Sequence, residues 1–114
     1  MSMESNIVYL EEEIKNHQER MQLMEKYLKD YPAISVYKRI IRGNIYYYKK
    51  FWKNGKSVSK FLCKNEDEYR REMKEIHAAN RKRQIIKKRL QEIKQTIKAL
   101  KRQLQIAKKA YKNV

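Results

Sequence analysis

From residue 69 to the end of the chain, apolar residues recur at alternating intervals of three and four, the repeat typical of a coiled coil. The positions are Tyr69, Glu72, Ile76, Ala79, Arg83, Ile86, Leu90, Ile93, Ile97, Leu100, Leu104, Ala107, Tyr111 and Val114. Only Glu72 and Arg83 are polar, and the repeat continues for about six heptads. Asn65 is a suitable N-cap, and three acidic residues follow it. The pattern predicts a long helix over residues 65–113.

The first thirty residues carry a shorter version of the same repeat. Its positions are Met3, Ile7, Leu10, Ile14, His17, Met21, Met24, Leu28 and Tyr31. Pro32 follows, and a proline disfavours helical geometry in the residue before it. We therefore expect an amphipathic helix over residues 3–31.

Between the two helices, the pattern is that of a β meander over residues 34–63. Asn54-Gly55 is a strong signal for a two-residue hairpin turn, and Gly43-Asn44 suggests a second one. The expected strands cover residues 35–42, 45–53 and 56–63. In this register Lys38 would lie opposite Lys49, and Lys49 opposite Lys60. The alternative for residues 34–42 is a short helix, which would leave a two-stranded hairpin.

The expected fold is therefore α+β and mostly α: one domain over residues 1–114, with an antiparallel coiled-coil pair and a small antiparallel meander between the helices. If the helices pair directly on either side of the meander, Met3 reaches about residue 94 and Arg83 meets Glu13. The apolar stripe beyond would have no partner within the chain, which favours a homodimer. The residues predicted to self-associate are Ile97, Leu100, Leu104, Ala107 and Tyr111.

The net charge of +16 is concentrated in two blocks. Residues 32–64 hold nine basic and no acidic residues, and residues 81–114 hold thirteen basic residues and one acidic residue. A field of this strength favours association with nucleic acid or with an acidic protein. We expect no membrane partner, because the apolar stripe is narrow.

The first candidate site is one face of the meander. A row of Lys38, Lys49 and Lys60 would be costly to bury, so this face is predicted to point outward, with Tyr47 and Phe51 stacking on bases. Further basic residues would surround it. These are Arg39, Arg42, Lys50, Lys53 and Lys56. The opposite face would pack on the helices, and it carries Tyr37, Ile41, Tyr46, Tyr48, Trp52, Phe61 and Cys63. The alternative is that the rings are simply the core of the sheet and the lysines prevent aggregation.

The second candidate site is the basic flank of the long helix. Its residues are Lys98, Lys101, Arg102, Lys108 and Lys109. If this part of the helix has no acidic neighbours, it is suited to lie along a phosphate backbone. The alternative is an ordinary solvated flank of a coiled coil.

No catalytic pattern is visible. Cys63 is the only cysteine, and His17 and His77 lie far apart in the sequence. We expect no enzyme activity, no cofactor and no metal site. The single cysteine and the polar amino-terminal residues favour the cytoplasm.

The run RIIRGNIYYYKKFWKNGKSVSKFL resembles the middle of a group of small prokaryotic and mobile-element proteins. These proteins have a basic meander of the form K-[IV]-x-G-x-x-Y-Y-Y-x-x-[YF]-x-x-G-G-K-x-x-S-K-[YF]-[IL] between two coiled-coil helices. The sequence departs from the pattern at Lys49 and Asn54. The resemblance implies a phage or mobile-element setting, but no established activity.

Two functions are compatible with these features. The first is a non-enzymatic protein that binds nucleic acid, with RNA or single strands favoured because stackable rings are present. The second is an inhibitor of a nucleic-acid-guided defence nuclease, of the anti-CRISPR type, that binds through its basic surface.

Overall fold

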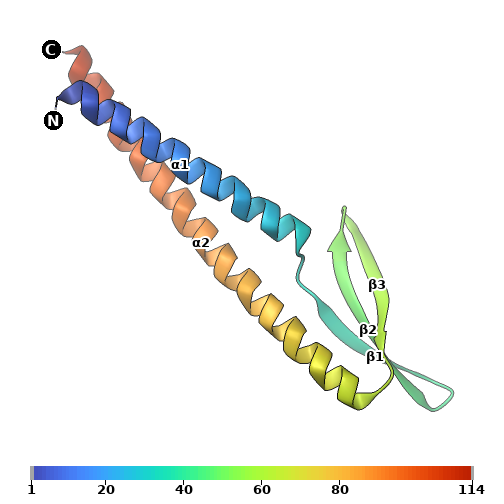
Figure 1. Cartoon of the computed structure of the whole chain (residues 1–114). Coiled ribbons are helices and arrows are strands. Elements are labelled where there is room, and N and C mark those ends of the chain that lie inside the picture. The colour runs from blue at the N-terminus through green and yellow to red at the C-terminus, as the bar shows by residue number, and fades with distance from the viewer. Residues whose placement is uncertain (1, 114) are drawn as a thin grey trace. The chain divides into compact units, whose positions relative to one another are not determined.

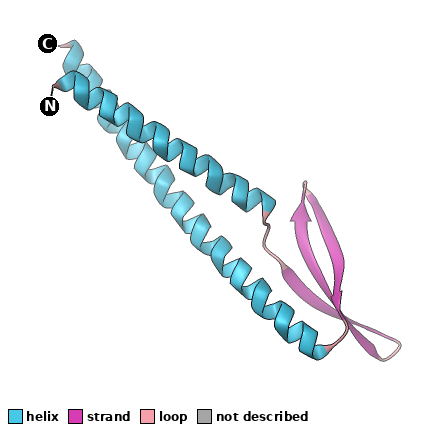
Figure 2. Cartoon of the chain, viewed as in Figure 1, coloured by secondary structure: helices cyan, strands magenta, loops and turns pink. Residues whose placement is uncertain are grey.

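A computed structural model describes residues 2–113 and confirms the expected α+β class, with helices predominating (Figures 1 and 2). In chain order, the elements are α1 (Met3–Asp30), β1 (Ser35–Ile41), β2 (Asn44–Lys53), β3 (Lys56–Cys63) and α2 (Glu66–Lys112). Residues 34–42 therefore contain a strand rather than a short helix. Val114, the last expected position of the heptad repeat, lies outside the described residues.

The chain divides into two compact units, which we describe separately. The helical unit contains the chain up to Tyr27 and from Ile86 onward. The sheet unit runs from Leu28 to Ile85 and contains the sheet, the last residues of α1 and the first turns of α2. That the chain behaves as a single domain stays a prediction.

Side-chain caps begin both helices. Ser2 Oγ accepts a hydrogen bond from the Ser5 amide at 3.1 Å at the start of α1. Asn65 Oδ1 accepts one from the Asp67 amide at 2.7 Å, as expected for the N-cap of α2. These caps satisfy backbone donors that have no partner within the helix.

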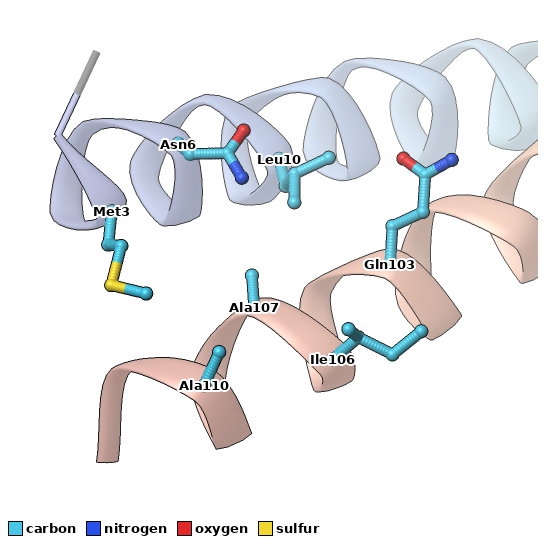
Figure 3. A pocket seen from close by; sticks show the side chains of 7 residues that line it. All are labelled: Met3, Asn6, Leu10, Gln103, Ile106, Ala107 and Ala110. Carbon is cyan, nitrogen blue, oxygen red and sulfur yellow. The ribbon is translucent and has the colours of Figure 1, made fainter. Parts of the chain in front are cut away.

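In the helical unit, α1 and α2 lie antiparallel and bury Leu10, Ile14, Leu90 and Ile97 (Figure 1). Their register differs from the prediction. Met3, expected opposite about residue 94, instead lines a groove with Ala107 and Ala110 (Figure 3).

The difference in register has a cause within the sheet unit. The first turns of α2 pack against the sheet and its leading segment, through Tyr69 and Asn80. Asn80 exchanges two hydrogen bonds with the backbone of Ile34, at 3.1 and 2.9 Å. The last turn of α1 first meets α2 at Arg83, whose guanidinium donates to the carbonyl oxygens of Leu28 and Tyr31 at 2.7 and 2.9 Å. The predicted pairing of Arg83 with Glu13 is therefore wrong.

This register covers the stripe that was expected to lack a partner. Ile97 is buried, Leu100, Leu104 and Ala107 are half-buried, and only Tyr111 is exposed. The predicted overhang beyond residue 94 is wrong, and the reason for expecting a dimer through these residues disappears with it.

The sheet is an antiparallel meander in the order β1-β2-β3. Both hairpins turn through two residues with positive φ: Asn54-Gly55 as expected, and Arg42-Gly43 instead of Gly43-Asn44. Glycine takes the second position in both turns, where it meets least steric resistance. Moving the first turn by one residue slides the β1–β2 pairing by two. Lys38 consequently lies opposite Tyr47, and Val36 lies opposite Lys49.

The β2–β3 pairing follows the expected register from Lys53–Lys56 to Tyr48–Phe61. An irregularity then shifts Tyr47 opposite Cys63, so the expected pair of Tyr47 with Leu62 is wrong. Extra residues of this kind increase the local twist of a strand pair. Residues 44–46, at the start of β2, pair only with β1. The turn between β1 and β2 therefore projects past β3 (Figure 2).

Candidate functional site

The sheet has two faces, because directly paired residues share a face and neighbours along a strand alternate. We call one the helix-side face. It carries Val36, Lys38, Ile40, Ile45, Tyr47, Lys49, Phe51, Lys53, Lys56, Val58, Lys60 and Cys63. We call the other the aromatic face. It carries Ser35, Tyr37, Arg39, Ile41, Tyr46, Tyr48, Lys50, Trp52, Ser57, Ser59 and Phe61.

The helix-side face packs against α2. The ring of Tyr47 stacks on that of Tyr69 with centroids 4.1 Å apart, and Cys63 is only 2% exposed. This is the face that was predicted to point outward, and that prediction is wrong. An outward orientation was expected because three lysines would form a row on this face. The observed register breaks the row, because Val36 stands beside Lys49 where Lys38 was expected.

The lysines of the helix-side face still reach solvent. Lys38, Lys53, Lys56 and Lys60 are exposed, and Lys49 is half-buried. Long lysine stems can cover apolar surface while the ammonium group stays in water, so packing this face costs little. The Lys60 ammonium lies 5.9 Å from the centre of the Phe51 ring.

The aromatic face holds a connected group of rings. Tyr37 stacks on Tyr48 with centroids 5.5 Å apart, and Tyr48 meets Phe61 edge-on at 5.8 Å. Tyr46 lies 6.4 Å from Phe61, and the Tyr37 hydroxyl is hydrogen-bonded to the Ser59 hydroxyl. These contacts fix the rings in place before any ligand arrives.

Much of this ring surface is open to solvent. Trp52 is 64% exposed, Phe61 55% and Tyr37 37%, and Tyr46 and Tyr48 are half-buried. Aromatic side chains usually bury most of their area in a small protein, so exposed rings on one face require an explanation.

Basic side chains accompany these rings. The Arg39 guanidinium lies 5.9 Å from the centre of the Tyr48 ring, and the Lys64 ammonium lies 5.4 Å from that of Tyr46. Lys50 is exposed on the same face. The strands contain no acidic residue, so every charged side chain that they contribute to this face is positive.

The structure therefore redistributes the predicted site residues. Arg39 and Lys50 lie among the exposed rings, and Arg42 lies in the first turn. Tyr47 and Phe51, predicted to stack on bases, are half-buried on the helix-side face.

The residues predicted to pack on the helices form the open surface instead. They are Tyr37, Tyr46, Tyr48, Trp52 and Phe61, with Lys64 beside them. One signal was available: Ser35, Ser57 and Ser59 share this face, and a face packed on helices would carry larger apolar residues there.

The basic flank of α2 lies in the helical unit. Lys98, Lys101, Arg102, Lys108 and Lys109 are all exposed. They do not form an isolated overhang, because α1 runs alongside. Lys94 forms an ion pair with Glu25 at 4.0 Å, and Leu10, next to the acidic run of α1, shares a groove with Gln103 and Ala107 (Figure 3). The prediction that this stretch extends beyond α1 is wrong.

Cys63 is placed for packing. Burial raises the pKa of its thiol, and the negative charges of Glu68 and Glu72 raise it further. A thiol that stays protonated is a poor nucleophile. His17 is half-buried in the helical unit, with Nε2 3.9 Å from the Glu13 carboxylate.

Two properties of residues 2–113 bear on ligands and membranes. Within that range, no three histidine, cysteine or acidic side chains gather closely enough to hold a metal ion. Neither described helix contains a segment apolar and long enough to cross a bilayer.

Comparison with known proteins adds nothing to this description: no family model, curated protein or solved structure matches the chain. The resemblance of the meander to mobile-element proteins therefore stays a prediction. The geometry of the site carries the functional argument.

Proposed function

We propose that the protein is a non-enzymatic nucleic-acid-binding protein that holds unpaired bases on the aromatic face of its sheet. One observation carries the proposal: Tyr37, Trp52 and Phe61 are exposed on a face that has basic but no acidic side chains. Stacking on aromatic rings is worth about 1–3 kcal/mol per base, and bases are available for it only where strands are unpaired.

The positions of the cations support the proposal. Arg39 and Lys64 lie over rings rather than reaching away from the sheet. Phosphates that flank a stacked base would meet these groups at the same surface. Each neutralised phosphate of a single strand releases counterions, so affinity would fall as salt is raised.

Trp52 provides a direct test, because it is the only tryptophan and lies on this face. Unlabelled single-stranded RNA is expected to quench the fluorescence of Trp52. Bound RNA should also reduce the quenching of Trp52 by iodide. The variant Tyr37→Thr/Phe61→Thr keeps strand propensity and Trp52, and should lose about tenfold or more in affinity with little change in salt dependence.

Two triple variants with the same change in charge separate this face from a general electrostatic field. Arg39→Gln/Lys50→Gln/Lys64→Gln acts on the aromatic face. Lys38→Gln/Lys49→Gln/Lys60→Gln acts on the helix-side face. The first should flatten the salt dependence more, by up to about 0.7 per lost phosphate contact in the log–log slope.

Equal effects of the two triple variants would reject binding by this face. If neither RNA nor single-stranded DNA binds near physiological salt, the proposal fails altogether. An acidic protein such as a defence nuclease would then be the partner to test by affinity capture.

A further inference from the structure

The turn between β1 and β2 has a composition unlike that of the other hairpin. We define the β1–β2 tip as residues 39–46, where β2 pairs only with β1. The cross-strand pairs here are Arg39–Tyr46, Ile40–Ile45 and Ile41–Asn44. The tip is therefore a two-stranded ribbon that continues the sheet beyond its third strand.

Three isoleucines of this ribbon are exposed to water. Ile40 is 67% exposed, Ile41 44% and Ile45 41%. The other hairpin turns through Lys53-Asn54-Gly55-Lys56, which is entirely polar apart from its glycine. Ile40 and Ile45 form an apolar cross-strand pair on one face, and Ile41 lies on the other face. Exposed apolar side chains on both faces of a projecting end favour contact with another molecule.

Arg42 adds a second, independent observation. Its φ is 51°, in the left-handed region, and Asn54 holds the equivalent position of the other turn at 53°. Asparagine tolerates this conformation, whereas a long side chain such as arginine adopts it at a cost. Residues held in unfavourable backbone conformations often serve binding, and Arg42 places a guanidinium at the extreme end of the tip.

Charge selects the class of partner. Residues 32–64 contain no acidic residue. The isoleucine and arginine side chains of the tip therefore lie in a segment whose charged residues are all basic. Proteins that kink nucleic-acid duplexes insert apolar side chains such as isoleucine between base steps, and arginine is a common hydrogen-bond donor to phosphate. The pair Arg39–Tyr46 belongs to the aromatic face, whereas Ile40 and Ile45 lie on the helix-side face. A strand that leaves a duplex packed on these isoleucines would therefore pass around the turn at Arg42 to reach the exposed rings.

From this arrangement we infer that the β1–β2 tip recognises the junction at which a duplex opens into a single strand. Ile40 and Ile45 pack against the last base pair, and Arg42 contacts the phosphate at the branch. The inference rests on the proposed function, because the aromatic face must hold the single strand that emerges.

The experiment compares three probes of related sequence: a single strand, a blunt stem-loop, and the stem-loop with the single strand as an overhang. Affinities are measured by anisotropy, and 2-aminopurine at the last base pair reports unstacking. The overhang probe should bind about tenfold more tightly than either of the others, and 2-aminopurine emission should rise on binding.

The decisive variant is Ile40→Thr/Ile45→Thr, which keeps β-branched side chains and so keeps the ribbon. It should remove the preference for the overhang and the 2-aminopurine signal, and leave the affinity for the single strand unchanged. Ile85→Thr, at another exposed isoleucine, is the matched control and should change neither. Arg42→Asn should raise the melting temperature yet weaken binding of the overhang probe.

The outcomes separate the two proposals. If the single strand binds and the overhang probe binds no better, or if the isoleucine variant keeps the preference, the junction inference is wrong and the proposed function stands. If no probe binds, both are wrong. If the isoleucines instead govern binding to vesicles of phosphatidylglycerol and phosphatidylcholine, with no preference among the probes, the tip contacts a membrane surface and the inference is overturned.

Discussion

At the residue scale, identical side chains that are adjacent in sequence lie in different environments. Tyr46, Tyr47 and Tyr48 are consecutive, yet Tyr47 stacks against α2 while its neighbours face the opposite side. The alternation of a strand imposes this division. A run of aromatic residues is therefore neither a core nor a binding surface as a whole.

Cys63 allows a prediction about pH at the same scale. Because the pKa of its thiol is raised in the folded state from the ordinary value of 9.0, the unfolded chain loses this proton first as the pH rises. The contribution of the thiol to the free energy of unfolding is therefore complete below pH 9.0 and is lost as the pH rises through the raised folded value.

Urea unfolding at several pH values between about 8 and 10 would measure this, with Cys63→Ala as the reference. The wild-type protein should lose stability more steeply than the variant. Parallel slopes would show that the thiol titrates alike in the folded and unfolded states. As an independent check, a thiol reagent should react slowly with the native protein and rapidly in denaturant.

At the scale of elements, Arg83 links the end of α1 to α2 within the sheet unit. It donates to two carbonyl groups at a helix C-terminus, where the helix dipole also favours a positive charge. The arginine thus sets where the two helices meet, although its partners are backbone atoms and not the acidic side chain that the sequence suggested.

We expect Arg83→Met to lower the free energy of unfolding by about 1.5–3 kcal/mol, because it removes two charge-assisted hydrogen bonds and leaves the half-buried Leu28 carbonyl without this donor. Arg81→Met, two residues earlier on the exposed side of α2, should stay within about 0.5 kcal/mol of the wild type. Chemical denaturation of both variants provides the measurement. Similar losses in both would mean that Arg83 acts only through the overall charge.

At the scale of the whole molecule, α1 covers the apolar stripe of α2 from within the same chain. We therefore expect a monomer with a mass near 14.0 kDa by light scattering at micromolar concentration. A mass of twice that value would instead support the dimer predicted from the sequence, and would point to apolar residues outside the covered stripe, such as Ile106.

The net charge of +16 also acts at this scale. It raises the rate at which any polyanion is captured and makes affinity depend on salt, whichever surface makes the contacts. Loss of binding after removal of a few charges is therefore weak evidence for a site, and the matched triple variants are needed for that reason.

The sequence by itself determined the elements of this protein and most of their ends. Local signals were sufficient: heptad spacing for both helices, Asn65 as a cap, and Asn54-Gly55 for the second turn. Most of each sheet face also followed from the sequence alone, because shifting the first turn by one residue slides the strands by two and leaves their faces unchanged. Cys63 is the exception, because the irregularity at Tyr47 moves it to the helix-side face.

Only the tertiary structure decided which face is open and how far the helices overlap. Both depend on contacts between residues distant in sequence, such as Tyr47 with Tyr69 and Ile34 with Asn80. The heptad repeat continues without change from the turns of α2 that meet the sheet to those that meet α1. An apolar spacing shows that a helix face is buried, and it does not specify which partner covers it.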